Sequence, residues 1–556
     1  MKPLDWAVMF GWIAFIVCYG LWRGRRSGTV SEYMLAGKTM PWYAMGLSIM
    51  ATQASAITFI STTGQAYVDG MRFVQFYFGL PVAMVILSAT AVPIFHRAKV
   101  YTAYEYLEKR FDAKTRALVS GIFLIQRGLA AGLALYAPSV VLSVILGWSD
   151  RSTTIVMGTL IVLFTATGGI KAVTWVDVQQ MAMIFASLLL AFGIAVYLLP
   201  PDVSFGDALT LAGALGRLRA VDTHFDPDNR YNLWSGLIGG SFLALAYFGC
   251  DQSQVQRYLT GKSIAQSRLS LIFNAMAKVP MQFFILFIGA IVFVAYLFLK
   301  PPVVFHPVEM QHLEANAGFA PVAKAYNTAF DKRRDAARKI VDARHAGTAF
   351  TTDDLRAAQK EFEAAKQQGN KLVEQTRGSA FNDTNYIFLN FVTTYLPVGV
   401  VGLIVAVIFS AAMSSTSGEI NSLASVTVID IYKRHVNATA TDRHYVWASR
   451  AATVFWGIYA VVFANFGGGF GALIEAVNMI GSLFYGGLLG VFVLAFFFPR
   501  VTANGAFFGV LAGEAAIFAA NRFTSISFLW YNVIGALVVV ATAQLFPKRE
   551  TKWLAS

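Results

Sequence analysis

Long apolar stretches, separated by short polar segments, dominate the chain. A helix needs about 20 apolar residues to cross roughly 30 Å of membrane hydrocarbon, and about thirteen stretches approach or exceed that length. We expect membrane-spanning helices at approximately 6–22, 42–66, 72–95, 117–147, 153–170, 174–199, 233–250, 270–299, 387–430, 446–466, 470–498, 503–521 and 527–546. The pattern predicts an all-α polytopic membrane protein with about thirteen transmembrane helices.

The amino-acid composition indicates that most of the chain lies in a lipid bilayer. Of its 556 residues, 56% are hydrophobic and 13% are charged, whereas a soluble domain has about 25% charged residues. Soluble enzymes, secreted disulfide scaffolds and nucleic-acid binders are therefore excluded. The net charge of +13 comes from the membrane part of the chain. The positive-inside rule accounts for that excess without a nucleic-acid partner.

The short loops predict how the chain lies in the membrane. Basic residues follow the first span at 23–38 and the third span at 97–116, and short loops rich in Lys and Arg stay in the cytoplasm. Alternation of the spans then places the N-terminus outside and the C-terminus in the cytoplasm. The alternate loops carry fewer basic residues, although Arg217, Arg219 and Arg230 weaken the contrast in one of them.

Residues 303–385 form a hydrophilic insert between two apolar stretches. The insert holds twelve Lys or Arg and eleven Asp or Glu. The predicted topology places it outside, which is permitted because loops longer than about 60 residues translocate largely regardless of charge. Two stretches rich in Ala, Lys, Arg, Glu and Gln, 321–346 and 352–377, predict an exposed helical hairpin. We expect a solvated cap over the outer vestibule, with binding of an external partner as the alternative.

Two spans carry polar residues in apolar surroundings. The second span contains Thr52 to Ser55, and the ninth contains Ser414 to Gly418, with four hydroxyl residues in a row. Hydroxyls and backbone carbonyls freed by an unwound helix are hard oxygen ligands, which suit a desolvated sodium ion. Tight helix packing by small hydroxyl residues is the other interpretation.

Five fragments, spread from residue 36 to 433, carry a family resemblance. They are AGKTMPWYAMGLSIMATQASAITF from Ala36, TAYEYLEKRF from Thr102, TGGIKAVTWVDVQQ from Thr167, DQSQVQRYL from Asp251, and AAMSSTSGEINS with DIYK from Ala411. In this order the chain resembles the sodium/solute symporter family. Its members include the sodium/glucose, sodium/proline, sodium/iodide and sodium-dependent monocarboxylate and multivitamin cotransporters.

The resemblance implies a LeuT-type fold, in which five spans recur in inverted orientation. It divides the chain into an extra N-terminal span with its cytoplasmic loop (1–35), a first repeat (36–200), a second repeat (201–302 and 386–498), the external insert (303–385) and two C-terminal spans with a short tail (499–556). It also implies sodium-driven alternating access. Nothing in the sequence requires more than a monomer.

The resemblance further implies two sodium sites. The main site takes backbone carbonyls of Ala51, Ala54 and Ala411 together with the hydroxyls of Ser414 and Ser415. A possible second site pairs Asp177 with two hydroxyls of the ninth span, those of Thr416 and Ser417. A salt bridge to a cytoplasmic Lys or Arg is the competing role for Asp177, because an unpaired carboxylate at that depth is costly.

Matching the family's motifs also gives candidates for the solute site and its gate. They are Gln53, Ser55 and Thr58 of the second span, Tyr247 as an inner gate, and Asn478 of the eleventh span. Ordinary packing is the alternative for each. The chain differs from the sugar-binding members of the family, because it has Ala244 and Thr58 at positions where a sugar transporter has amide side chains.

Arg127 is a basic residue inside an otherwise apolar span, which by default marks a functional site. A carboxylate of the solute is one candidate partner. The alternatives are snorkelling to the cytoplasmic surface, or a pair with Glu475, another charge deep in a span. The sequence LALYAPSVVL that follows it resembles the monocarboxylate, vitamin and iodide branch more than the sugar branch. Both features favour an anionic solute.

These features predict a symporter that imports a small solute, organic or inorganic anions included, and takes Na⁺ as its coupling ion. A solute sensor that uses the same fold and signals through a separate partner is the alternative. An enzyme is not expected, because the seven His residues form no metal-binding motif. There is also no phosphate-binding loop of the G-x-x-x-x-G-K-[ST] type.

Overall fold

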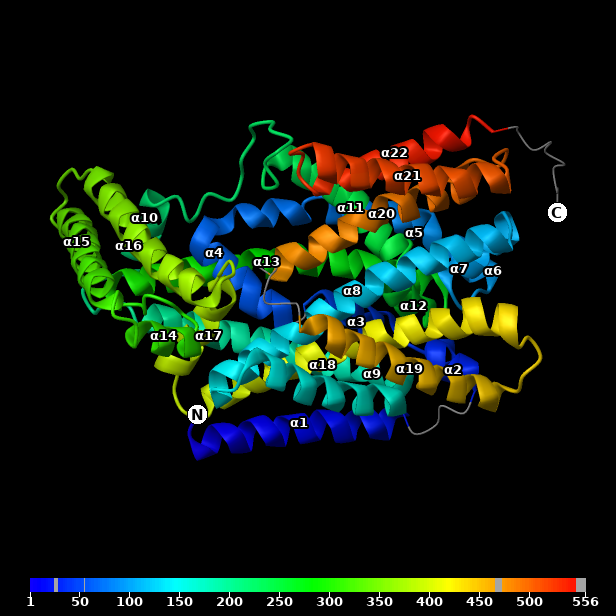
Figure 1. The fold of residues 1–556 in the computed structure, drawn as a ribbon, viewed down its shortest axis with the longest axis horizontal. Helices are drawn as coiled ribbons and strands as arrows, with labels where there is room; N and C mark the ends of the chain where they lie inside the picture. Colours follow the sequence, from blue (N-terminus) through cyan, green and yellow to red (C-terminus); the bar gives the residue numbers. More distant parts are fainter. Residues whose placement is uncertain (25–28, 55, 466–472, 547–556) are drawn as a thin grey trace.

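The computed structural model describes residues 1–24, 29–54, 56–465 and 473–546. Its long helices run side by side along one axis, with α1 at one side of the bundle and α21 and α22 at the opposite side (Figure 1). Within these residues β structure is limited to one isolated bridge between Met40 and Gly261. The prediction of an all-α protein is confirmed.

Each predicted span coincides with one or more helices. Nine helical segments of the described part are long and apolar enough to cross a membrane, and two shorter apolar segments, Ser235–Gly249 and Leu529–Ala543, accompany them. The longer helices are α1 (Pro3–Gly24), α8 (Ala113–Leu146), α9 (Asp150–Tyr197), α13 (Ile264–Phe298), α18 (Val400–Val426), α19 (Asp442–Ala464), α20 (Leu473–Phe497), α21 (Ala503–Phe523) and α22 (Leu529–Ala543). The shorter ones are α2 (Val30–Leu35), α3 (Trp42–Gln53), α4 (Thr63–Asp69), α5 (Leu80–Ala89), α6 (Ala91–Ala98), α7 (Ala103–Arg110), α10 (Phe205–Ala214), α11 (Gly240–Gly249), α12 (Gln252–Leu259), α14 (Pro307–Glu314) and α17 (Ile387–Tyr395).

Two interruptions shape the first half of the bundle. The predicted span 42–66 is broken: α3 ends at Gln53, Ala54 leaves the helical conformation with φ −88° and ψ 55°, and the chain turns helical again before α4. Helix α9 contains a sharp kink at Gly169, where φ is 63°. Only glycine takes that conformation readily. The kink accounts for the two separate spans predicted over the length of α9.

The predicted single span 387–430 is wrong. Two helices occupy it, because α17 ends at Tyr395 and α18 begins only at Val400. Pro397 lies between them and has no backbone N–H to continue a helix. The run from Ser414 to Gly418 lies inside α18, which is continuous and almost entirely buried there.

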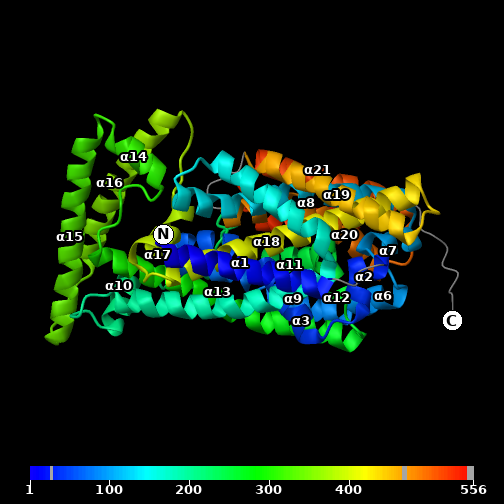
Figure 2. The same cartoon turned by 90° about the horizontal axis from the view of Figure 1, so that it is seen from below.

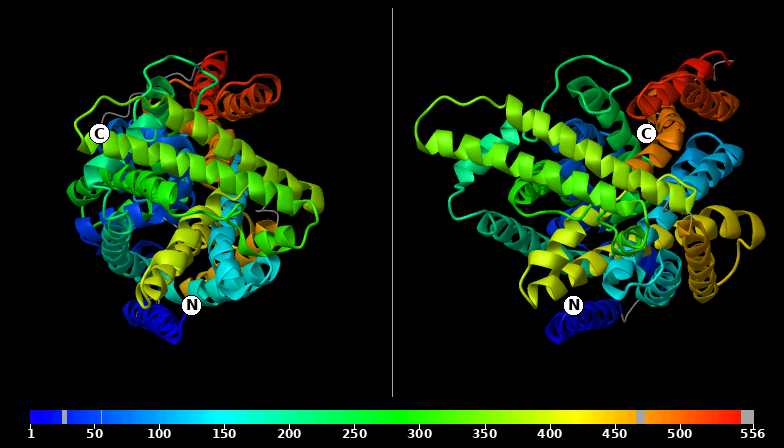
Figure 3. Two further views of the ribbon diagram at one scale, coloured as in Figure 1. Left: turned by 90° about the vertical axis from the view of Figure 1, so that its left-hand side faces the viewer. Right: turned by 60° about the vertical axis from the view of Figure 1, so that its left-hand side comes forward.

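The charged insert folds as the predicted hairpin. Helix α15 (Phe319–His345) and helix α16 (Asp353–Arg377) pack against each other and lie across one end of the bundle (Figure 3). The hairpin is also anchored to the bundle. Arg333 is fully buried and donates to the backbone oxygen of Tyr296 in α13 at 2.6 Å, while Arg344 pairs with Asp207 of α10 at 2.8 Å.

The first residue of α1 and the last residue of α22 lie toward opposite ends of the bundle. The N-terminus lies toward the end that carries the hairpin, and α22 runs toward the other end (Figure 2). The side of a membrane that each end faces stays a prediction. Helix α1 packs along α9 and α18, so the N-terminal span contacts the helix that carries the hydroxyl cluster.

Candidate functional site

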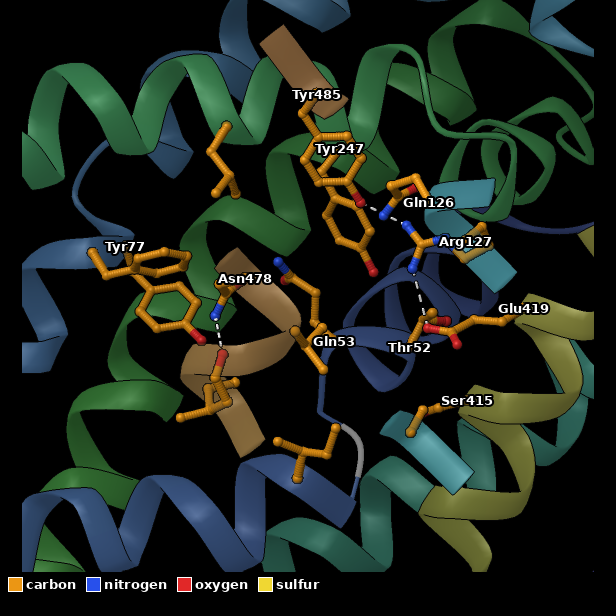
Figure 4. Close-up of a pocket in the computed structure, with 16 residues that line it drawn as sticks. Thr52, Gln53, Tyr77, Gln126, Arg127, Tyr247, Ser415, Glu419, Asn478 and Tyr485 are labelled. Carbon is orange, nitrogen blue, oxygen red and sulfur yellow. Dashed lines mark hydrogen bonds and ion pairs between the residues drawn. The ribbon is translucent and has the colours of Figure 1, made fainter. Parts of the chain in front are cut away.

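A buried cavity lies where the broken end of α3 faces α8, α11, α18 and α20 (Figure 4). Its polar lining comes from all of these helices, and its apolar lining adds Tyr77 and Phe76 on one side. The polar residues of the lining are Thr52, Gln53, Gln126, Arg127, Tyr247, Ser415, Glu419, Asn478 and Tyr485. Convergent polar groups in an otherwise apolar cavity are typical of a small-molecule site.

The broken end of α3 leaves backbone oxygens without helical partners next to residues that line this cavity, Thr52 and Gln53. The last carbonyls of a helix have no partner inside the helix, and Ala51 lies in that last turn. One carbonyl is satisfied locally, because the hydroxyl of Thr58 donates to the oxygen of Gln53 at 2.8 Å. Ala54 is fully buried just past the end. Two carbonyl ligands predicted for the main sodium site therefore lie at the break.

The α18 ligands predicted for the main sodium site lie within one helical turn. Ala411, Ser414 and Ser415 are all buried. The hydroxyl of Ser415 has no hydrogen-bond partner in the described part of the chain and lines the cavity. The hydroxyl of Ser414 instead donates to Asp177 of α9. The structure thus brings Ser415 to the same cavity as the last residues of α3.

Asp177 is fully buried and held by three donors. It accepts from Ser48 of α3 at 2.5 Å, from Arg257 of α12 at 2.7 Å, and from Ser414. A salt bridge to an arginine, the competing role expected from the sequence, is therefore present. A side chain at position 418 would meet the guanidinium of Arg257, which would have to shift to make room.

Thr416 and Ser417 are not among the donors to Asp177. Ser417 donates to the backbone oxygen of Ser414 at 3.0 Å. The hydroxyl of Thr416 is buried without a partner in the described residues. The second sodium site stays a prediction.

Arg127 is buried in α8 and bound by two carboxylates. It pairs with Asp251, at the start of α12, and with Glu419 of α18 at 3.1 Å. It also donates to the hydroxyl of Tyr485 at 2.6 Å and lies over the ring of Tyr247, 5.4 Å from its centroid. This network joins α8, α18 and α20 with the start of α12, and Figure 4 shows how Arg127 faces Glu419 and Tyr485.

The expected alternative pair between Arg127 and Glu475 is wrong. Glu475 pairs with Arg230 at 2.7 Å and accepts from Tyr231, both in the segment that precedes α11. Glu419 is absent from the candidates predicted from the sequence, although it lies in the fragment AAMSSTSGEINS. A systematic search for carboxylates within apolar stretches would have found it.

The remaining candidates for the solute site divide into three groups. Gln53, Tyr247 and Asn478 line the cavity, and their contact with the solute stays a prediction. Thr58 does not line it, and its hydroxyl closes the end of α3 instead. Ser55 lies outside the described residues.

The model of one known protein family matches most of the chain. The family model described as "Sodium:solute symporter family" covers residues 33–324 and 363–513. The interval between these two ranges falls within the hairpin of α15 and α16, which is therefore largely an addition to the family's common part.

Individual relatives share the whole length of the chain. It is 27% identical to the sodium/sialic acid symporter NanT of Aliivibrio fischeri, over 98% of this chain and 92% of the relative. It is also 27% identical to the sodium/glucose cotransporter of Vibrio parahaemolyticus, over 98% and 90%. The sequence identity to the sodium-coupled monocarboxylate transporter 1 of Xenopus laevis is also 27%, over 92% of this chain and 70% of that relative.

A solved structure confirms the predicted LeuT-type fold. It shows a Na⁺-coupled sialic acid symporter in a substrate-bound, outward-open state, with 24% sequence identity and a TM-score of 0.74 over 99% of this chain and 100% of the other. The chain belongs to the sodium:solute symporter family, whose members are sodium-coupled membrane transporters and not enzymes.

Proposed function

We propose that this protein imports a small solute together with sodium by alternating access, and that the cavity at the break of α3 holds the solute. The observation that carries the proposal is the meeting of a broken membrane helix with the unpaired hydroxyl of Ser415 at one buried polar cavity. Non-helical backbone at membrane depth is tolerated where it lines a cavity or binds an ion. Such a site near the middle of the bundle is what alternating access requires.

The main sodium site consists of the carbonyls of Ala51, Ala54 and Ala411 with the hydroxyls of Ser414 and Ser415. The hydrogen bond from Ser414 to Asp177 supports this role. A hydroxyl that donates its hydrogen still has two lone pairs on oxygen. Asp177 therefore orients the oxygen of Ser414 toward a cation and strengthens its partial negative charge. Sodium binding then draws the end of α3 against α18.

The second sodium site requires a rearrangement. Asp177 is neutralised by Arg257, so a sodium ion between Asp177 and the hydroxyls of Thr416 and Ser417 has to replace that pair or share it. We infer that the ion pair holds Asp177 in the sodium-free protein. The pair is then exchanged for an ion when the site is loaded.

The class of solute follows from the groups around Arg127. An anionic solute has to compete with Asp251 and Glu419 for the guanidinium. The relatives transport sialic acid, glucose and monocarboxylates according to their names, so the family provides no single solute. An anion stays one candidate class. No finding above favours the sensor alternative.

The predicted orientation completes the proposal. The N-terminus and the hairpin face the outside, and α22 ends at the cytoplasmic side of the cell membrane. A monomer contains both the cavity and every proposed sodium ligand.

Transport assays with the purified protein in liposomes test the proposal. A panel of sugars, amino acids, monocarboxylates, vitamins and inorganic anions is first screened for sodium-dependent thermal stabilisation, with potassium as the control ion, because a bound ligand stabilises the native state. Uptake of the best ligand is then measured with an inward sodium gradient. Replacing Ser414 and Ser415 by Ala together should abolish sodium-driven uptake.

Ser410→Ala provides the matched control. Ser410 is a buried serine of the same helix, and its hydroxyl donates to the backbone oxygen of Ala406 at 2.7 Å. Its loss should leave sodium dependence unchanged. Undiminished sodium-driven uptake by the double variant would refute the main site. Absence of any sodium effect on the unmodified protein would refute symport.

A further inference from the structure

The charges joined by ion pairs beside the cavity include more negative than positive side chains; Lys278 of α13 is also fully buried, but no ion pair joins it to them in the described residues. Two arginines and three carboxylates are buried there: Arg127, Arg257, Asp177, Asp251 and Glu419. Arg257 pairs with Asp177, and Arg127 pairs with Asp251. Glu419 is the third carboxylate, and it shares the guanidinium that Asp251 already neutralises. This group of charges therefore has one negative charge in excess when all five are ionised.

One oxygen of Glu419 is unused. Its Oε1 accepts from Arg127 at 3.1 Å, while Oε2 is buried without a hydrogen-bond partner in the described part of the chain. Ser415 lies one helical turn earlier on α18, and its buried hydroxyl is also without a partner there. The same holds for Oε1 of Gln53, at the end of α3. All three residues line the cavity (Figure 4).

Three oxygens without donors around one cavity call for a positive ligand. A buried carboxylate oxygen without a partner is costly, and more so in a membrane. The end of α3 adds the negative end of a helix dipole. Arg127 does not meet this need through Nη1 and Nη2, because these two nitrogens are already bound by Asp251, Glu419 and Tyr485.

We propose that Glu419 Oε2 and Ser415 Oγ, one helical turn apart on α18, form a site for a monovalent cation inside the central cavity, with Gln53 Oε1 further along the same cavity. The cation is either a sodium ion or an ammonium group of the solute, because both accept a carboxylate, a hydroxyl and an amide oxygen as neighbours. The site rests on the proposed function, because it takes this cavity as the place where ligands bind and shares the hydroxyl of Ser415 with the proposed main sodium site.

Glu419→Gln tests the proposal because it removes the charge at nearly constant shape. Glu514→Gln is the matched control, since Glu514 is a mostly buried glutamate of α21 that does not line the cavity and whose oxygens also have no partner in the described residues. The full-length proteins are titrated with sodium chloride or methylammonium chloride at constant ionic strength kept with potassium chloride. The readout is the cation concentration that gives half of the thermal stabilisation.

The expected result is an increase of that concentration by about tenfold or more in Glu419→Gln, with no change in Glu514→Gln. An increase for sodium identifies the ligand as the coupling ion, and an increase for methylammonium identifies an amine-bearing solute. The proposal would be overturned if, for both cations, the half-stabilising concentration of Glu419→Gln stayed within about twofold of that of the unmodified protein. A carboxyl group that stays protonated in the cavity would produce that outcome.

Gln53→Leu keeps the test decisive if Glu419→Gln does not fold. It removes a cavity oxygen without touching the charges, and a smaller increase in the same direction is expected. The two proposals also fail separately. If sodium does not stabilise the unmodified protein, symport is refuted, while the methylammonium titration still decides the cation site. If neither cation stabilises it, the cation site is refuted as well.

Discussion

The ion pair between Asp177 and Arg257 provides a quantitative test of the charge network. Both side chains are buried, with exposed side-chain fractions of 0% and 1%, and their nitrogen and oxygen atoms are 2.7 Å apart. Removing one partner of a buried pair leaves the other charge without compensation, which costs about 3–5 kcal/mol. We therefore expect Asp177→Asn to lower the free energy of unfolding by about that amount, since Arg257 keeps its charge at any usable pH.

The pairwise contribution is separated by a double-mutant cycle. Arg257→Gln should also destabilise the protein. The variant with both substitutions should lose less unfolding free energy than the two single variants lose together, by about 2 kcal/mol or more. The assay is equilibrium unfolding in mixed micelles of SDS and dodecyl maltoside, followed by tryptophan fluorescence. Single losses that add within about 0.5 kcal/mol would refute the reasoning.

A surface pair serves as the control for this cycle. Lys332 and Glu361 of the hairpin are 2.9 Å apart, but their side chains are 58% and 54% exposed. Water screens such a pair, so the same type of cycle should give at most about 1 kcal/mol. Comparable coupling energies at the two places would show that burial does not determine the contribution of the ion pair.

Four further predictions follow from individual features. If a second sodium ion binds, Asp177→Asn should lower the Hill coefficient for sodium in uptake assays; an unchanged coefficient would return Asp177 to a structural role. Deleting 321–377 with a short linker should spare transport in liposomes, because the family model omits most of the hairpin; complete loss would show that the hairpin is part of the gate. Although burial raises the pKa of Asp207, hydrogen bonds from Ser204 and His345 outweigh it and lower the pKa below its ordinary value. Its stabilisation is therefore present above about pH 4 and lost as the pH falls through the lowered pKa, and Asp207→Asn should remove that part of the acid dependence in thermal melts. Gly169→Ala should destabilise the protein by about 1–3 kcal/mol, because φ is 63° and the added carbon would lie 3.1 Å from Tyr33; unfolding in mixed micelles measures the loss, and an unchanged stability would contradict the strain.

The sequence alone was sufficient to predict features that depend on local chemistry. The helices follow from the length of the apolar stretches, and the break after Gln53 follows from a polar run within one of them. The hairpin follows from two helix-forming stretches joined by residues 346–352. Each of these signals lies within a short stretch of chain, so the fold of distant parts does not alter it.

The partners of buried charges were not predictable in this way. Arg127 meets Asp251 and Glu419 across separations of 124 and 292 residues, and hydropathy does not distinguish these carboxylates from Glu475. Which of them faces the arginine depends on how α8, α12 and α18 pack. The boundary between α17 and α18 was missed for a related reason, because both helices are apolar and the short connection at Pro397 hardly changes the mean hydropathy.

The excess negative charge gives a physical reason for coupling. An empty cavity with all five central groups ionised carries one uncompensated negative charge, and closing the protein around it removes that charge from water at a large cost. One bound monovalent cation brings the net charge of these five groups to zero and removes most of the cost of taking that charge out of water. A ligand shifts a conformational equilibrium only by its difference in affinity between the two states, and neutralisation supplies that difference. On this account the cation favours occlusion through Glu419, so Glu419→Gln should let the empty transporter close more easily. In liposomes that variant should show faster solute exchange without sodium relative to its sodium-driven uptake, whereas an unchanged ratio would separate the charge excess from coupling.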